Sequence, residues 1–337
     1  MGRGELLQPE SAEGRAALAA VLGRALALPV EVTEVVALSG GASSATWAIT
    51  LAAAGESRRA IVQRSASTEH AGLSRATQAE LLRRAAALGV PVAPVLAVPA
   101  PEDGLGDCVI TGFVAGEALA PRWLRDPALA PARGKLVGQC AAALARLHAA
   151  PLAHWADLPL SGGSGAELLA QMFATYRRLG VDVPAFDLAF AWLKPRMPSH
   201  GPTCLAHGDF RSGNFLVSQE GLTAVLDWEI AHRSVPEEDL GWLCVQAWRF
   251  GNWQLPVGGF GMREELVESY RAAGGTVDAA DLWTWEVFGN LRWGLSCLQL
   301  ADDHVSGRVP SVERAAIGRR VSEVAADLVH AIERGDV

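Results

Sequence analysis

The sequence predicts an α+β protein with two lobes, a small N-terminal lobe built on an antiparallel sheet and a larger helical C-terminal lobe. The first part of the chain contains several short apolar runs separated by glycine and proline turns, which is typical of strands. From about residue 114, apolar residues recur at helical spacing. A chain of 337 residues is long enough for two cores. We therefore expect a lobe at 1–113 and a second at 114–337.

Composition and charge exclude several classes of protein. The net charge of −8 argues against general binding to nucleic acid or to anionic membranes. No apolar run reaches the length of a membrane span, and the N-terminus lacks the apolar core of a signal peptide. The five cysteines form no C-x-x-C pair, so we expect buried, reduced thiols. These features favour a cytoplasmic protein, either a monomer or a homodimer.

The first elements suggest a hairpin that closes over phosphate. Residues 12–27 have helical spacing, residues 32–38 and 46–51 resemble two strands, and a glycine- and serine-rich turn joins the strands. Glycine lets the backbone approach a phosphate closely, and backbone N–H and hydroxyl groups can donate to it. The candidate nucleotide-binding residues of this turn are Ser39, Gly40, Gly41, Ser43 and Ser44.

The remaining elements follow in order. A strand is expected at 60–64, a helix at 74–88 that Gly89 and Pro91 end, and strands within 90–98 and 107–116. Beyond them, amphipathic spacing predicts helices at 133–148, 166–179, 240–250, 263–273, 279–296 and 312–333. Six tryptophans lie within 242–293, which indicates either packing between helices or the lining of an acceptor pocket.

One polar loop carries the chemistry. The stretch from His207 to Asn214 lies between two predicted strands, and the following strand ends at Asp227. Asp209 is suited to accept a proton from an attacking hydroxyl, and Arg211 to face the transferred phosphate. Asn214 and Asp227 offer the hard oxygen ligands that Mg²⁺ prefers. These residue types at this spacing predict phosphoryl transfer.

The loop His207-Gly-Asp-Phe-Arg-Ser-Gly-Asn214 has the H-x-D-x-x-x-x-N spacing of the protein-kinase catalytic loop. Together with 226–232 and with Pro236-Glu-Glu-Asp-Leu-Gly-Trp242, it resembles the aminoglycoside phosphotransferase superfamily. The closest likeness is to the branch that contains the kinase-like domain of some acyl-CoA dehydrogenases. The resemblance implies a bilobal protein-kinase-like fold, ATP and Mg²⁺ as cofactors, and a small-molecule hydroxyl as acceptor.

The resemblance also assigns positions in the nucleotide-binding lobe. Kinases carry a phosphate-binding lysine on the third strand, but no lysine precedes Lys135 here, so Arg64 is the best-placed substitute. Arg58 and Arg59 compete with it. Glu80 stands where the resemblance places the glutamate that pairs with this cation. The adenine would contact the Gly112 carbonyl and the Val114 N–H.

Two further roles are expected near this loop. His207 is expected to anchor the catalytic loop by a hydrogen bond to backbone or to Asp227. Asp239 is expected to cap the helix that follows it.

Several alternatives stay open. An aminosugar acceptor would need acids, and a hydroxyacyl metabolite or another anion would need basic groups. The donor is either ATP or GTP. A non-catalytic nucleotide-binding module is the rival from another class, and the missing lysine supports it. The acids available are Glu237, Glu238, Asp302 and Asp303, and the bases are Arg249, Arg292 and Arg308.

Overall fold

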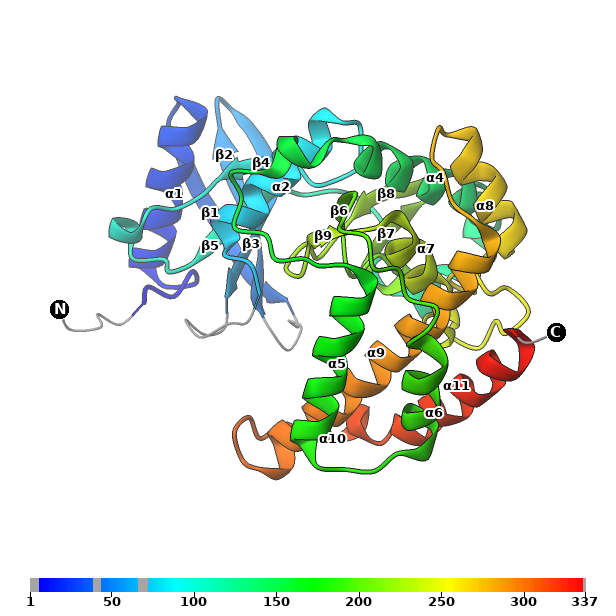
Figure 1. Cartoon of the computed structure of the whole chain (residues 1–337). Coiled ribbons are helices and arrows are strands. Elements are labelled where there is room, and N and C mark those ends of the chain that lie inside the picture. Colours follow the sequence, from blue (N-terminus) through cyan, green and yellow to red (C-terminus); the bar gives the residue numbers. More distant parts are fainter. Residues whose placement is uncertain (1–5, 39–43, 66–71, 336–337) are drawn as a thin grey trace. The chain divides into compact units, whose positions relative to one another are not determined.

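The computed structural model describes residues 6–38, 44–65 and 72–335. The chain divides into two compact units, each with its own core. The first unit comprises Met1–Gly116 together with Thr223–Ile230, and the second comprises Glu117–Leu222 together with Ala231–Val337. The two units are described separately below (Figure 1).

The first unit is built on a five-stranded antiparallel sheet with the strand order β1-β2-β3-β5-β4. Two helices accompany the sheet, α1 (Ala12–Leu26) and α2 (Arg75–Ala87). The strands are β1 (Val30–Leu38), β2 (Ser44–Ala53), β3 (Glu56–Ser65), β4 (Val95–Ala97) and β5 (Cys108–Gly112).

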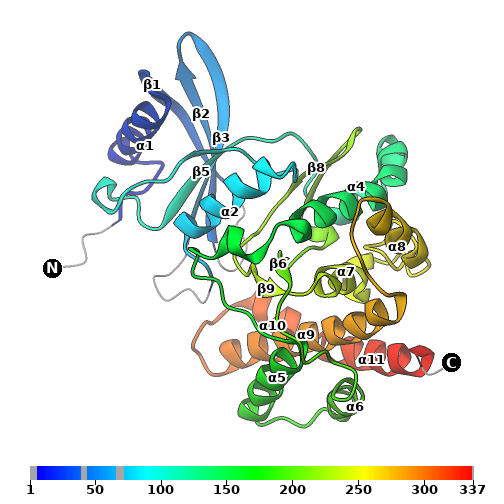
Figure 2. The same cartoon turned by 45° about the horizontal axis from the view of Figure 1, so that its top comes forward.

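Alternation along the strands forms the core of this unit. Every second residue of β2 is buried, so one face of the sheet is apolar. Leu18 and Leu22 of α1 belong to the same core cluster as Ile49 and Val62 of the sheet. Figure 2 shows α1 beside β1 and β2. Ser11 caps α1 by accepting a hydrogen bond from an N–H of its first turn.

The second unit is mainly helical. Its largest core joins α5, α6, α9 and α11 through side chains such as Phe186, Phe288 and Leu328. The helices are α3 (Ala120–Trp123), α4 (Ala130–Ala149), α5 (Gly165–Leu179), α6 (Pro184–Leu193), α7 (Pro236–Cys244), α8 (Arg263–Ala272), α9 (Ala279–Val305), α10 (Val312–Gly318) and α11 (Val321–Gly335).

Short strands bracket the polar loop of this unit. β6 (Cys204–Ala206) precedes the loop and pairs antiparallel with β9 (His232–Ser234). β7 (Phe215–Ser218) follows it and forms a two-stranded sheet with β8 (Gly221–Val225). Nearby, α7 and α9 pack closely because Gly241 lacks a side chain. A Cβ atom at Gly241 would lie 2.6 Å from the backbone of Trp285.

The structure confirms the predicted α+β class, with an antiparallel-sheet lobe and a helical lobe. Some boundaries were wrong. The helix expected at 240–250 begins earlier, because Pro236 suits the first helical turn, and it gives way to a 3₁₀ turn, η5 (Gln246–Arg249). The helix expected at 312–333 is two helices, and the ten-residue α6 was not predicted.

Two expectations about the whole chain can be compared with the structure. All five cysteines are unpaired and buried, and burial raises the pKa of the thiols, which makes them poor nucleophiles. In the described part of the chain, no helix has both the length and the apolar character needed to cross a membrane.

Candidate functional site

The polar loop leaves β6 through a turn that requires glycine. Gly208 has a φ of 80°, which is a left-handed conformation that side chains disfavour. Asp209 follows this turn and is not part of β6. The 3₁₀ turn Ser212–Asn214 then leads directly into β7. Ser212 is buried and donates its hydroxyl to the carbonyl of Trp248 at 2.6 Å. The loop is therefore held at both ends.

Three side chains hold the carboxylate of Asp209. Arg211 Nε lies 2.9 Å from Oδ1 and 3.1 Å from Oδ2. Trp242 Nε1 donates to Oδ1 at 2.8 Å, and Asn214 Nδ2 donates to Oδ2 at 2.6 Å. The Asp209 side chain is 15% exposed, so it is oriented by the protein and still accessible. This arrangement suits a general base that must meet a substrate hydroxyl.

Asn214 is oriented by the same contacts. Its Nδ2 also donates to the Asp209 carbonyl at 2.9 Å, and two oxygen acceptors for one nitrogen fix which end of the amide faces Asp209. Oδ1 therefore points elsewhere as a hard oxygen donor, which fits a Mg²⁺ ligand. In residues 6–38, 44–65 and 72–335, no group of three or more His, Cys, Asp or Glu side chains could hold a metal.

Asp227, the other predicted ligand, belongs to the first unit. Its φ of 65° places it in the left-handed region, which is uncommon for a residue other than glycine and is typical of functional positions.

Asp239 supports the loop from within the second unit. It is fully buried inside α7, and its carboxylate accepts the backbone N–H groups of His207 at 2.7 Å and of Gly208 at 2.9 Å. Burial alone would raise its pKa, but hydrogen bonds from His148 and from the His207 backbone hold the pKa of Asp239 below its usual value. The expectation that Asp239 caps a helix was wrong, because Asp239 lies inside α7 and its side chain binds the backbone of the polar loop instead.

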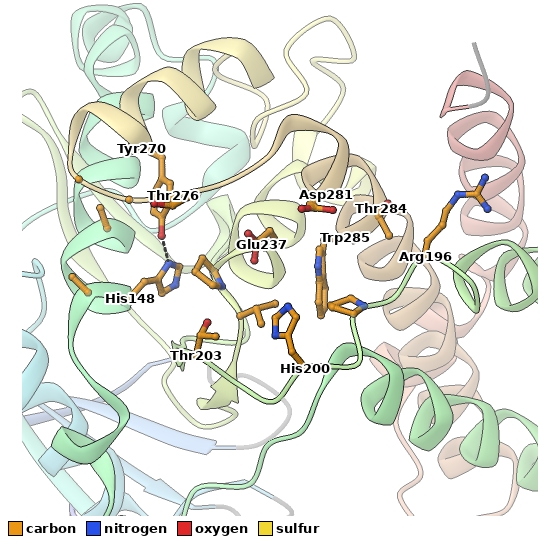
Figure 3. A pocket seen from close by; sticks show the side chains of 17 residues that line it. His148, Arg196, His200, Thr203, Glu237, Tyr270, Thr276, Asp281, Thr284 and Trp285 are labelled. Atoms are coloured by element: carbon orange, nitrogen blue, oxygen red, sulfur yellow. Dashed lines mark hydrogen bonds between the residues drawn. The ribbon is translucent and has the colours of Figure 1, made fainter.

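Histidines complete this support. His148 is buried between Asp239, 3.2 Å from its Nε2, and the Tyr270 hydroxyl, 2.9 Å from its Nδ1. Figure 3 shows His148 and Tyr270 at one side of a cavity of about 410 Å³ that Glu237 also lines. His207 accepts the Asp209 N–H at 3.1 Å through its Nδ1, which agrees with the expected role as a backbone anchor.

A second buried acid lies on the other side of the loop. Arg292 donates to Glu238 at 2.7 Å and to the Gly208 carbonyl, and its guanidinium lies 3.7 Å from the centre of the Trp242 ring. Burial would raise the pKa of Glu238, but His232 and Arg292 hold it below its usual value. Arg292 also lines the cavity described next. Arg292 and Trp242 therefore connect that cavity to the loop of Asp209.

This cavity, which we call the Arg292 cavity, has a volume of about 320 Å³. Amide and hydroxyl side chains share its lining with apolar ones and with the Glu238–Arg292 pair. The lining residues are Ser161, Leu168, Gln171, Met172, Thr175, His232, Glu238, Phe288, Arg292, Leu295, Ser296 and Gln299. Its size lies at the small end of the usual range for ligand sites.

The sequence contains a set of acids and a set of arginines as candidates for binding the acceptor. Most of these side chains form ion pairs, so their charges are largely neutralised. Arg292 pairs with Glu238, and Arg308 pairs with both Asp302 and Asp303. Arg249 pairs with Glu286, and Glu237 lines the cavity of Figure 3. In the Arg292 cavity the charges of Arg292 and Glu238 are paired, so charge alone does not select the acceptor there.

The predicted nucleotide-binding turn is only partly described. Ser39, Gly40, Gly41 and Ser43 lie outside the described residues. Ser44 begins β2, opposite Ser65 of β3.

Arg64 lies at the end of β3, as expected, but faces α1. Its guanidinium donates to the Leu7 carbonyl at 2.8 Å and to Gln8 at 3.0 Å, and it lies 4.8 Å from the centre of the Trp47 ring. Strand alternation places Arg64 on the same face as Val62, which packs in the α1 core. The structure therefore gives Arg64 a packing role on this face of the sheet.

The expected pair between Arg64 and Glu80 is not found among the ion pairs of the described residues. Glu80 lies on α2 and pairs with Arg84 at 2.8 Å and with Arg83 at 3.6 Å. The reason is local, because these arginines are its neighbours on the helix surface, while Arg64 is directed to the α1 face. Three polar side chains of α2 are buried, Arg75, Thr77 and Gln78, and Gln78 accepts from Arg75 at 2.8 Å.

The predicted adenine contacts lie at the end of β5. The N–H of Gly112 donates to the Pro94 carbonyl at 2.8 Å, and a Cβ atom here would lie 2.9 Å from the Pro94 ring. Glycine is therefore required at this position. Val114 follows two residues later, outside the strand and partly buried.

Sequence reasoning missed Trp242 and Arg292 as contacts of the loop. Trp242 stands in the motif that carried the resemblance, three residues after Asp239, so helical spacing placed both on one face of α7. No signal in the sequence marked Arg292, which lies 84 residues after Gly208 and meets it only in the folded chain.

Comparisons with known proteins identify the family and the fold of this chain. The model of the phosphotransferase enzyme family (APH) matches residues 34–283. No curated protein matches the chain.

Solved structures share the fold at low sequence identity. A protein from Ralstonia eutropha JMP134, provisionally described as an aminoglycoside phosphotransferase, is 18% identical with a TM-score of 0.69, over 95% of this chain and 98% of that one. Macrolide 2′-phosphotransferase MphH from Brachybacterium faecium is 20% identical with a TM-score of 0.58, over 94% and 98%.

A thermostable mutant of aminoglycoside phosphotransferase APH(4)-Ia, in a ternary complex with AMP-PNP and hygromycin B, is 17% identical with a TM-score of 0.61, over 96% of this chain and 98% of that one. The likeness to the acyl-CoA dehydrogenase branch stays a prediction. Because the family model covers most of the chain, this chain belongs to the phosphotransferase enzyme family, within the aminoglycoside phosphotransferase superfamily, and is a kinase-type phosphotransferase.

Proposed function

We propose that the protein transfers the γ-phosphoryl group of ATP to a hydroxyl of a small molecule, with Asp209 as the general base. The observation that carries this proposal is the Asp209 carboxylate, held by Arg211, Trp242 and Asn214 on a loop whose backbone Asp239 fixes. The AMP-PNP complex of a similar structure supports a nucleoside triphosphate as donor. We assign nucleotide binding to residues 1–113 and catalysis with acceptor binding to residues 114–337.

The acceptor hydroxyl approaches Asp209, which takes its proton as the oxygen–phosphorus bond forms and the bond to the β-phosphate oxygen breaks. Arg211 contacts the carboxylate through Nε alone, which leaves its two Nη groups to donate to the oxygens of the transferred phosphoryl. The Trp248 ring, 4.6 Å below the Arg211 guanidinium, holds that fork in place.

The metal ligands we propose are Asn214 Oδ1 and the Asp227 carboxylate. A Mg²⁺ ion there would neutralise charge on the triphosphate. In the nucleotide lobe, we propose that the phosphates bind to the turn that contains Ser39, Gly40, Gly41, Ser43 and Ser44. The nucleotide base would contact Gly112 and Val114. The contacts of Arg64 and Glu80 weigh against their pairing around the phosphates.

We place the acceptor in the Arg292 cavity. Arg292 lines the cavity and lies on the Trp242 ring, and Trp242 donates to Asp209, so two side chains in contact connect the cavity to the base. Its charged groups are paired, and the other polar groups of its lining are amides and hydroxyls. Such a lining favours a hydroxyl-rich acceptor. An aminosugar and a hydroxyacyl metabolite are the two classes to be screened.

A non-catalytic nucleotide-binding module is the alternative. A degenerate site would lack one of Asp209, Asn214 and Asp227, and this chain has all three. The absence of a lysine before Lys135 is the feature that favours this alternative.

Asp209→Ala tests the proposal. The wild type is incubated with ATP, Mg²⁺ and hydroxylated acceptors, and mass spectrometry detects the gain of one phosphate. The variant should lose at least ~100-fold in turnover, as expected when a general base is removed, and should bind ATP with unchanged affinity. Asp182→Ala, an exposed aspartate in the same unit, is the matched control. Undiminished turnover in Asp209→Ala would remove Asp209 from this role.

A further inference from the structure

A third cavity of the second unit, with a volume of about 310 Å³, lies where η5, α8 and α11 meet. We call it the Arg249 cavity. In the described part of the chain, it shares no lining residue with the Arg292 cavity or with the cavity of Figure 3. The lining residues are Gln246, Arg249, Trp253, Gln254, Pro256, Met262, Arg263, His330 and Arg334.

The lining of the Arg249 cavity is basic, although the protein as a whole is acidic. Three arginines and a histidine face it, and no carboxylate is among the described lining residues. One buried acid, Glu286, binds two of the arginines, at 2.8 Å to Arg249 and at 2.7 Å to Arg263. Glu286 offsets one of the three arginine charges, and Asp327, which accepts from Gln246 at 2.7 Å, offsets part of the charge of Arg249, so the cavity keeps a net positive charge.

Arg249 itself has unused hydrogen-bonding capacity. It is 5% exposed, and its two terminal nitrogens donate to the Cys244 carbonyl, to Glu286 and to Gln246. Its Nε is buried and has no partner among the described residues. Burial lowers the pKa of Arg249 despite the adjacent Glu286. A buried guanidinium with an unsatisfied donor, in the lining of a cavity with excess positive charge, is a typical binding element for an oxyanion.

We propose that the Arg249 cavity binds a small phosphate monoester at a site separate from the catalytic loop. A phosphate monoester carries close to two negative charges at neutral pH, which suits a cavity with net positive charge. Its tetrahedral oxygens can accept from several guanidinium groups at once. Trp253 is 60% exposed and, with Pro256 and Met262, gives the cavity an apolar wall for the organic part of the ligand.

The site is connected to the polar loop indirectly, through the 3₁₀ turn η5. Arg249 directly follows Trp248, whose ring supports Arg211 and whose carbonyl accepts the Ser212 hydroxyl. The ligand therefore contacts the 3₁₀ turn η5 that carries Trp248. This inference goes beyond the proposed function, and binding is measured without turnover, so either can fail while the other stands.

The test is calorimetric titration of the intact protein, without nucleotide or metal, using glycerol 3-phosphate, glycerate and glycerol. Glycerol 3-phosphate should bind, glycerate should bind about ten-fold more weakly because it carries one charge, and glycerol should not bind. Equal binding of glycerate would overturn the assignment to phosphate. No heat at millimolar glycerol 3-phosphate would overturn the site.

Variants locate the binding. Arg334 lies at the exposed end of α11, and Arg334→Gln should weaken the binding of glycerol 3-phosphate about ten-fold. Arg319 is an exposed arginine outside the cavity, so Arg319→Gln should not change this affinity. Asp327→Asn should tighten binding, because Asp327 opposes the charge of Arg249. Equal weakening by both arginine variants, or displacement of glycerol 3-phosphate by AMP-PNP, would contradict the proposal.

Discussion

At the scale of single residues, Asp209 depends on donors that come from different elements. Arg211 and Asn214 belong to its own loop, but Trp242 comes from α7. An indole N–H is a fixed donor on a rigid ring, so Trp242 orients the carboxylate without competing for its proton. We infer that Trp242 is a positioning residue, which acts through Asp209.

Trp242→Phe should lower kcat about ten-fold or more with little change in the KM for ATP, because one hydrogen bond to a charged group is lost while most of the ring is kept. Steady-state kinetics with a screened acceptor measures this split. Trp123→Phe is the matched control, since Trp123 is also buried and its N–H has no partner among the described residues. A kcat loss of the same size in both variants would indicate a packing effect only.

Arg64→Ala should destabilise the first unit without changing the affinity for nucleotide. Arg64 links the segment before α1 to β3 through Leu7, Gln8 and the Trp47 ring, and such contacts contribute about 1–2 kcal/mol. Thermal unfolding and ATP titration measure the two effects. Arg58→Ala, which removes an exposed arginine of the same strand, is the control. Weakened ATP binding would restore Arg64 as the phosphate-binding cation.

At the scale of elements, α7 connects the loop to the helical core. Asp239 on α7 accepts two N–H groups of the loop, and Gly241, two residues later, lets α7 lie directly on the backbone of α9. The support of the loop is therefore as rigid as the α7–α9 packing. This explains why a short motif after the loop carries so much of the resemblance.

The contact between α11 and η5 should make stability depend on pH. Burial raises the pKa of Asp327 from 3.8 to about 6. Between about pH 4 and pH 6 the folded protein keeps a proton that the unfolded chain has lost, so stability falls as pH rises through this window. Asp327→Asn should remove this contribution and raise Tm above pH 6 relative to wild type.

Thermal unfolding from pH 4 to pH 8 measures the effect of Asp327→Asn, with the exposed Asp182→Asn as control. The difference in Tm between Asp327→Asn and the wild type should be smallest near pH 4 and largest above pH 6. A difference that is constant with pH would show that Asp327 does not titrate in this window.

At the scale of the molecule, the two units have separate cores. A ligand that binds the folded state stabilises it by mass action, by ~2.7 kcal/mol at a concentration one hundred times its Kd. ATP with Mg²⁺ should therefore raise Tm in the wild type and equally in Asp209→Ala. A shift that disappears in Asp209→Ala would mean that Asp209 contributes to nucleotide binding and not to the chemistry alone.

The sequence by itself determined the fold class, the order of most elements and the polar loop. These depend on local patterns, since strand alternation, helical periodicity and the spacing of Asp209 and Asn214 are all set by neighbours along the chain. The helix at 312–333 and the missed α6 show the limit of such patterns, because helix ends and short helices depend on packing as well.

Only the tertiary structure decided the partners of the site. We predicted Arg64 as the phosphate-binding cation from its position on a strand, but the packing of the α1 core determines which side of the sheet its side chain occupies. Glu80 pairs with an arginine of its own helix. The loop is contacted by Asp239, Trp242 and Arg292, which lie 31 to 84 positions after their partners in the sequence. No local sequence pattern specifies such contacts. The physical reason is that hydrogen bonds and ion pairs form between groups that folding brings together, and the burial that strengthens them exists only in the packed chain.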